Sequence, residues 1–171
     1  SRLQGGSTLH WLGVSLRMLP EDFEMKTRFG VGRDWPIGYD DIEPFYRKAE
    51  LEMGISADVE DQEYHGIRFP QGYDFPMQRV PQRYADQKLG AAVDGKDVSL
   101  GEFRVPLKVR SYPAARNSMP RGSYVPVGAV DTRENGQQTI PETGDRCQGN
   151  TSCTPICPVQ AKYHAGKSLA R

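Results

Sequence analysis

The clearest pattern along the chain is a helical one. Apolar residues recur about every 3.6 positions between residues 41 and 53, which predicts an amphipathic helix with one face on a core. That face comprises Ile42, Phe45, Tyr46, Ala49 and Met53. Pro44 belongs in a first turn and favours Asp41 as the N-cap, Glu43 is interpreted as a second capping carboxylate, and Gly54 stands where helices often end.

A second pattern, with a period of two, predicts a strand within residues 99–112. Its apolar positions are Phe103, Val105, Leu107 and Val109, and they alternate with charged residues. Because Pro106 cannot donate a backbone hydrogen bond, we expect this strand at a sheet edge or a bulge.

The remaining segments are expected to be less regular. Pro70, Pro76 and Pro81 break residues 55–83 into loops, and residues 113–146 are polar without a period. Asn135-Gly136 predicts a turn inside that stretch. Helix signals return after Pro158, and residues 161–171 are expected to be helical.

Composition supports a loop-rich, mixed fold. The chain has 171 residues, of which 18 are Gly and 13 are Pro, and 37% are hydrophobic. Its 22 Lys and Arg balance its 22 Asp and Glu, so no basic excess is present for nucleic-acid binding or for a polybasic membrane anchor. The chain begins without Met and ends in helix signals, and we expect it to be an internal piece of a longer protein.

Two segments carry candidate chemistry. The paired glycines Gly5 and Gly6 either bring the backbone close to a ligand or form a tight turn, and neither common nucleotide fingerprint is complete there. The three cysteines, Cys147, Cys153 and Cys157, have the spacing C-x5-C-x3-C-P.

The cysteine spacing leaves three alternatives open. Three thiolates on a short Gly- and Pro-containing loop suit an iron–sulfur cluster. A structural zinc site requires a fourth ligand, for which His65 or His164 is available. The third alternative is a disulfide with a spare thiol, or three unrelated thiols.

Several motifs together resemble the glucose–methanol–choline (GMC) flavin oxidoreductases. The matching segments are Gly5-Gly6-Ser7-Thr8-Leu9-His10-Trp11, the run from Gly30 to Ile37, the run from Tyr39 to Tyr46 with Ala49-Glu50, and Ala115-Arg116-Asn117-Ser118. The tail from Cys147 to Tyr163 is similar to the bacterial sugar and sugar-acid dehydrogenases of this family that carry a three-iron cluster. That branch often has a further cysteine where this chain has Gln148.

The resemblance implies an α+β fold, with a partial FAD-binding (Rossmann-like) domain and part of a GMC substrate domain. It divides the chain into a FAD-contacting segment (1–54), a substrate-domain segment (55–146) and a cluster loop with the start of a FAD-domain helix (147–171). The residues implied to contact FAD are Gly5, Gly6, Ser7, Thr8, His10 and Trp11. The ligands implied for a 3Fe-4S cluster are Cys147, Cys153 and Cys157. His10 either tethers the flavin covalently or packs beside Trp11, and Lys162 and Tyr163 either contact the cofactor surroundings or lie on a helix surface.

The implied activity is a dehydrogenase that oxidises a hydroxyl of a sugar, polyol or sugar acid by hydride transfer to FAD, with electrons leaving through the cluster. The catalytic residues are expected downstream of this chain. The implied partners are a cytochrome c subunit and a small chaperone-like subunit, with no nucleic acid, and the implied location is the periplasm or the inner membrane, with the cytoplasm as the alternative. Two other interpretations remain: a GMC oxidase that uses oxygen, and a zinc-stabilised module without catalysis.

Overall fold

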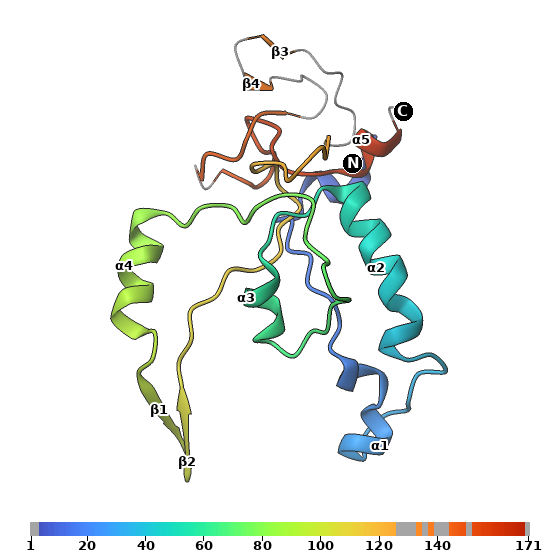
Figure 1. The fold of residues 1–171 in the computed structure, drawn as a ribbon, viewed down its shortest axis with the longest axis vertical. Coiled ribbons are helices and arrows are strands. Elements are labelled where there is room, and N and C mark those ends of the chain that lie inside the picture. Colours follow the sequence, from blue (N-terminus) through green and yellow to red (C-terminus); the bar gives the residue numbers. More distant parts are fainter. Residues whose placement is uncertain (1–3, 126–132, 135–136, 139–143, 150–151, 170–171) are drawn as a thin grey trace.

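The computed structural model describes residues 4–125, 133–134, 137–138, 144–149 and 152–169. The helical elements are the 3₁₀ turns η1 (Gly6–Leu9) and η2 (Pro20–Phe23) and the helices α1 (Met25–Phe29), α2 (Tyr39–Met53), α3 (Val59–Glu63), α4 (Tyr84–Val93) and α5 (Ala165–Leu169). The strands β1 (Asp97–Leu100) and β2 (Phe103–Pro106) form one antiparallel pair, and β3 (Arg133–Glu134) and β4 (Gln137–Gln138) form another. Short helices and strands joined by long loops fit the expected α+β, loop-rich character (Figure 1).

The predicted helix is present as α2, but it starts two residues earlier than expected. Gly38, not Asp41, is the N-cap. The Asp41 carboxylate accepts a hydrogen bond from the Gly38 N–H over 2.8 Å, so it caps the helix from its third position. Pro44 therefore lies inside the helix, where its missing N–H leaves the carbonyl of Asp40 without the usual intrahelical partner.

The buried face of α2 also differs from the prediction. Phe45 is 62% exposed and Ala49 is exposed, whereas Tyr39, Glu43 and Glu50 are buried. Glu43 is therefore not a capping carboxylate. Two acidic residues occupy the inner face because a buried arginine from another segment lies against it. Apolar periodicity does not reveal this face, since part of it is polar.

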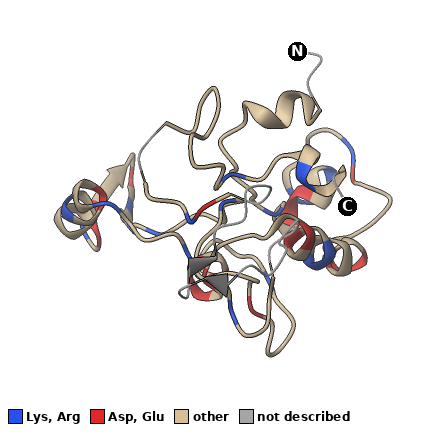
Figure 2. Ribbon diagram, turned by 90° about the horizontal axis from the view of Figure 1, so that it is seen from above, with Lys and Arg blue, Asp and Glu red and all other residues tan. Residues whose placement is uncertain are grey.

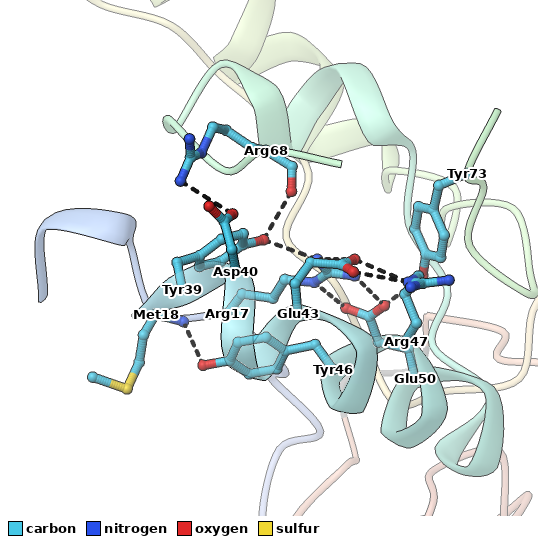
Figure 3. Close-up of polar contacts among 10 residues, drawn as sticks. All are labelled: Arg17, Met18, Tyr39, Asp40, Glu43, Tyr46, Arg47, Glu50, Arg68 and Tyr73. Atoms are coloured by element: carbon cyan, nitrogen blue, oxygen red, sulfur yellow. Dashed lines mark hydrogen bonds and ion pairs between the residues drawn. The ribbon is translucent and has the colours of Figure 1, made fainter. Parts of the chain in front are cut away.

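That arginine is Arg17, which is 8% exposed (Figure 3). Its guanidinium donates to both carboxylate oxygens of Glu50 over 2.7 Å and to Glu43 over 3.2 Å. It also donates to the Tyr39 hydroxyl over 2.9 Å, and the Tyr73 hydroxyl donates to Glu50. Burial alone would lower the pKa of Arg17, but the hydrogen bonds and charge of Glu50, supported by Tyr39, raise it above its ordinary value. This network joins α2 to the segment before η2.

Single β-bridges hold the centre of the molecule together in place of long strands. Ser56 is fully buried and pairs with Met77 on one side and Ala114 on the other, and Ala114 also pairs with Val14. The adjacent apolar core consists of Ile55, Ala57, Phe75 and Ala115. A second small core contains Phe23, Tyr39 and Ile67 under α2.

The predicted strand is confirmed only in part. β2 ends at Pro106 and pairs with β1 alone, as expected for an edge strand, and all four of its residues are exposed. The hairpin and α4 lie on the opposite side of the molecule from α2 (Figure 1). Because the hairpin stands out from the core, the alternation of residues 103–109 does not mark a buried face.

Three further predictions concern the loops of residues 55–83, the C-terminal helix and a turn at Asn135-Gly136. Residues 55–83 are mostly loop, with the short α3 inside them. The helix expected from residue 161 begins only at Ala165, since Lys162 forms a β-bridge with Arg116. The Asn135-Gly136 turn lies outside the described residues.

Basic and acidic residues alternate along the described helices and loops (Figure 2). The described part of the chain contains no helix with the length and apolar character needed to cross a bilayer.

Candidate functional site

The glycine segment, defined as residues 5–11, forms a tight turn. Gly5 and Gly6 both have positive φ angles, 100° and 52°, which side chains other than glycine rarely adopt. A methyl group at Gly5 would lie 3.3 Å from the Gly166 nitrogen, so α5 approaches closely. The Thr8 hydroxyl donates to the Gly5 carbonyl and accepts from the Ala165 N–H over 2.9 Å. The glycine segment is thereby fixed to the start of α5.

The glycine segment also contacts the cysteine loop, defined as the described residues 147–149 and 152–157. His10 Nδ1 lies 3.3 Å from the Pro155 carbonyl oxygen, at hydrogen-bond distance. Lys162 Nζ donates to the Leu9 carbonyl over 3.0 Å and to the Cys153 carbonyl over 2.6 Å. Two segments about 140 residues apart, each proposed from the sequence to hold a cofactor, therefore lie side by side.

The three cysteines line one cavity of about 540 Å³. Its other walls come from α4 and from the segments around Tyr112 and Lys162. All three are free thiols, so the disulfide alternative is not what the structure contains. Cys157 is buried, and the other two are partly exposed.

The geometry of the thiols bears on the metal alternatives. Among the described residues, no three His, Cys, Asp or Glu side chains gather closely enough to hold a single metal ion. Around one tetrahedral zinc, sulfurs lie about 2.3 Å from the metal and hence within roughly 4 Å of each other. In a cluster each thiolate binds a different iron, so the sulfurs stand further apart. The three cysteines therefore share one cavity but do not form a mononuclear metal site within the described residues.

Neither histidine considered for a zinc site lies in the wall of this cavity. His65 lines a separate cavity of about 350 Å³ beside Arg17. His164 lies against Gly5 and Gly166, and within the described part of the chain its Nδ1 has no hydrogen-bond partner. Burial, and then the charges of Lys167 and Lys162, lower the pKa of His164 and favour its neutral form.

The cavity is lined by more positive than negative groups. The charged residues in its walls are Arg83, Arg110, Arg116, Lys162 and Asp86. Asp86 pairs with Arg83 over 2.9 Å, and Arg110 lies within ion-pair distance of Asp61 and Asp94, so Arg116 and Lys162 account for the remaining positive charge of the lining. Such a lining favours negatively charged occupants, including thiolate-bound clusters.

Two buried lysines lie close to the cysteines. Burial lowers the pKa of Lys162, and the nearby Cys153 and Cys157 act in the opposite direction. Burial lowers the pKa of Lys167 to about 8, with Cys157 again opposing. Lys167 Nζ donates to the Gln160 carbonyl over 2.6 Å. The alternative that Lys162 lies on a helix surface is wrong, since it is 3% exposed and precedes α5.

The sequence candidates are therefore brought together only in part. His10 is exposed and reaches Pro155 of the cysteine loop, whereas Trp11 is half-buried and reaches Tyr163, which lies shortly before α5. Ser7 is exposed and lies in η1. Sequence reasoning missed Arg83, Tyr112 and one side of α4 as cavity walls, because no motif connects them to the cysteines.

Comparison with known proteins gives two matches. The chain is 34% identical over 160 residues to the fructose dehydrogenase large subunit of Gluconobacter japonicus, which covers 94% of this chain and 24% of that protein. It is 40% identical over 62 residues to 2-methyl-1,2-propanediol dehydrogenase of Mycolicibacterium austroafricanum, which covers 35% of this chain and 11% of that protein. The chain resembles two dehydrogenases.

These matches concern segments of larger proteins. The chain spans about a quarter of the length of the fructose dehydrogenase subunit and about a ninth of the other protein. No protein-family model matches the chain. Both matched proteins are named dehydrogenases.

Proposed function

We propose that this chain is part of a GMC-type, FAD-dependent dehydrogenase that oxidises a hydroxyl group of a sugar, polyol or sugar acid. The order of the motifs supports the family, and the similarity over 160 residues to a fructose dehydrogenase subunit supports the substrate class. FAD, when bound, accepts a hydride from the alcohol and releases its electrons one at a time.

The observation that carries the proposal is the adjacency of the glycine segment and the cysteine loop. Gly5, Gly6, Ser7, Thr8, His10 and Trp11 would contact the flavin, and a Cβ added at Gly6 would meet no atom within 4 Å, so the backbone there has open space beside it. Cys147, Cys153 and Cys157 would hold a 3Fe-4S cluster in the cavity that they line. The contacts of His10 and Lys162 would then keep the two groups close, as single-electron transfer requires.

The proposal also covers partner subunits and cellular location. The matched fructose dehydrogenase polypeptide is named a large subunit, which implies that it works with other subunits. For this protein we propose a cytochrome c subunit as electron acceptor, a small chaperone-like subunit, and a periplasmic or inner-membrane location. The base that takes the alcohol proton is proposed to lie outside the 171 residues.

The test uses the purified full-length protein under anaerobic conditions. Addition of fructose, a polyol or a sugar acid is expected to bleach the oxidised flavin spectrum, and an added one-electron acceptor restores it. Cys153→Ser is expected to keep the bleaching and slow the recovery, whereas Gln148→Ala, which alters the same cavity without removing a thiol, leaves both unchanged. Absence of bleaching with every substrate contradicts the proposal, and rapid peroxide formation in air identifies an oxidase instead.

A further inference from the structure

Lys162 makes the most direct connection between the two proposed cofactor segments. Its side chain is buried, with 3% of the residue exposed, and its ammonium donates to the carbonyls of Leu9 and Cys153. One acceptor belongs to the glycine segment and the other to the cysteine loop. Hydrogen bonds from a charged donor are stronger than neutral ones, and more so away from water.

The charge of Lys162 has no carboxylate partner among the described residues, since both of its hydrogen bonds go to carbonyl groups. A buried charge without a counter-charge is costly. Lys162 also lines the cavity that the three thiols share. An anionic group in that cavity would supply the missing counter-charge, and a cluster bound by three thiolates is such a group.

We infer, on the basis of the proposed function, that Lys162 is a positioning residue that joins the flavin and cluster segments and stabilises the reduced cluster by its positive charge. Gain of one electron makes the cluster more negative, so a fixed positive charge beside it favours the reduced form. Removal of the charge lowers the reduction potential, and removal of the ammonium loosens the contact between the two segments.

The first test is the reduction potential of the cluster in the full-length protein, measured by redox titration with EPR detection. Lys162→Met is expected to lower the equilibrium constant for one-electron reduction about tenfold, which is a shift of about 59 mV to lower potential. Lys48→Met is the matched control, because it removes the same charge from an exposed position on α2. An unchanged potential in the Lys162 variant overturns the electrostatic role.

The second test does not require a bound cluster. Hydrogen–deuterium exchange of peptides containing Leu9 and Cys153 is expected to be faster in Lys162→Met than in the wild type and unchanged in Lys48→Met. Lys162→Gln keeps N–H donors without the charge, so it replaces the Met variant if that variant does not fold. Its exchange is expected to lie between that of the wild type and that of Lys162→Met. Equal exchange in the variants and the wild type overturns the joining role. A wild-type protein without iron, sulfide and flavin refutes the proposed function instead, and the exchange result still stands.

Discussion

The indole N–H of Trp11 donates a hydrogen bond to the backbone carbonyl of Tyr163 over 2.8 Å. The two rings pack edge to face with their centroids 6.5 Å apart. These residues are 152 positions apart, and their contact fixes the glycine segment beside the approach to α5 (Figure 1). The candidate site is therefore built where two distant parts of the chain meet.

The contact between Trp11 and Tyr163 predicts a measurable loss of stability. Trp11→Phe keeps an aromatic ring but leaves the Tyr163 carbonyl without its donor, and we expect a loss of about 1 kcal/mol in the free energy of unfolding. Denaturant unfolding of the full-length protein measures it. Trp35→Phe is the control, because Trp35 is 52% exposed. A loss as large in the control would contradict the role of the hydrogen bond.

Disruption of the buried Arg17 network is expected to lower the free energy of unfolding more than the Trp11 change does. Arg17→Met leaves Glu50 buried without a counter-charge, whereas Glu43 keeps its ion pair with Arg47, and the change is expected to cost about 3 to 5 kcal/mol in the free energy of unfolding. Adding Glu50→Gln is expected to recover part of the loss. Arg28→Met breaks exposed ion pairs with Glu24 and Glu21 and is expected to change little. Similar losses at Arg17 and Arg28 would show that the network is not buried in solution.

The buried Tyr73 hydroxyl is expected to make the free energy of unfolding depend on pH in the alkaline range. Burial, and then the charge of Glu50, raise the pKa of Tyr73 above its ordinary value of about 10. Above pH 10 the unfolded chain loses this proton while the folded protein keeps it, so the free energy of unfolding falls as the pH rises. The slope is at most about 1.4 kcal/mol per pH unit.

Tyr73→Phe isolates this contribution. Below pH 10 the variant is expected to be less stable than the wild type, because the hydrogen bond to Glu50 is lost. The difference is expected to shrink between pH 10 and 11, since only the wild type carries the tyrosine slope. Denaturant unfolding at several pH values measures both, and parallel pH profiles would contradict the pKa direction.

At Gly144, next to the cysteine loop, a side chain is expected to cause a steric clash. It has a φ of 75°, and a methyl group there would overlap the backbone carbonyl of Gln160. Gly144→Ala is therefore expected to displace the chain entering Cys147 and to lower the thermal unfolding midpoint. Gly72→Ala is a matched control, with a φ of 77° and open space around it, so it tests backbone strain alone. Equal midpoints for the two variants would contradict the close packing at Gly144.

Part of this architecture was predictable from sequence because the signals were local. Gly54 ends α2 as expected, and Pro106 restricts β2 to a two-stranded edge. The cap at Gly38 was missed because Asp41 acts from the third helical position, a role that resembles an N-cap in sequence. The helix α4 buries only Gly90, so no apolar face along it has to repeat with the helical period.

The candidate site was predictable in its parts and not in its assembly. The spacing of Cys147, Cys153 and Cys157 identified one segment and Gly5-Gly6 the other, because each is contiguous in sequence. His10 and Lys162 connect the two segments, and the buried Lys162 forms a β-bridge with Arg116 and is not part of a helix. Pairing between distant segments leaves no local sequence pattern. The inner face of α2 is a second example, because its acidic residues contact Arg17, which lies in a different segment.

The proposed cluster beside a flavin is tested by the content of iron, acid-labile sulfide and flavin in the full-length protein purified without oxygen. We expect about three irons and about four sulfides for each flavin, and loss of the iron and sulfide but not of the flavin in Cys157→Ser. One zinc per chain with no sulfide would contradict it.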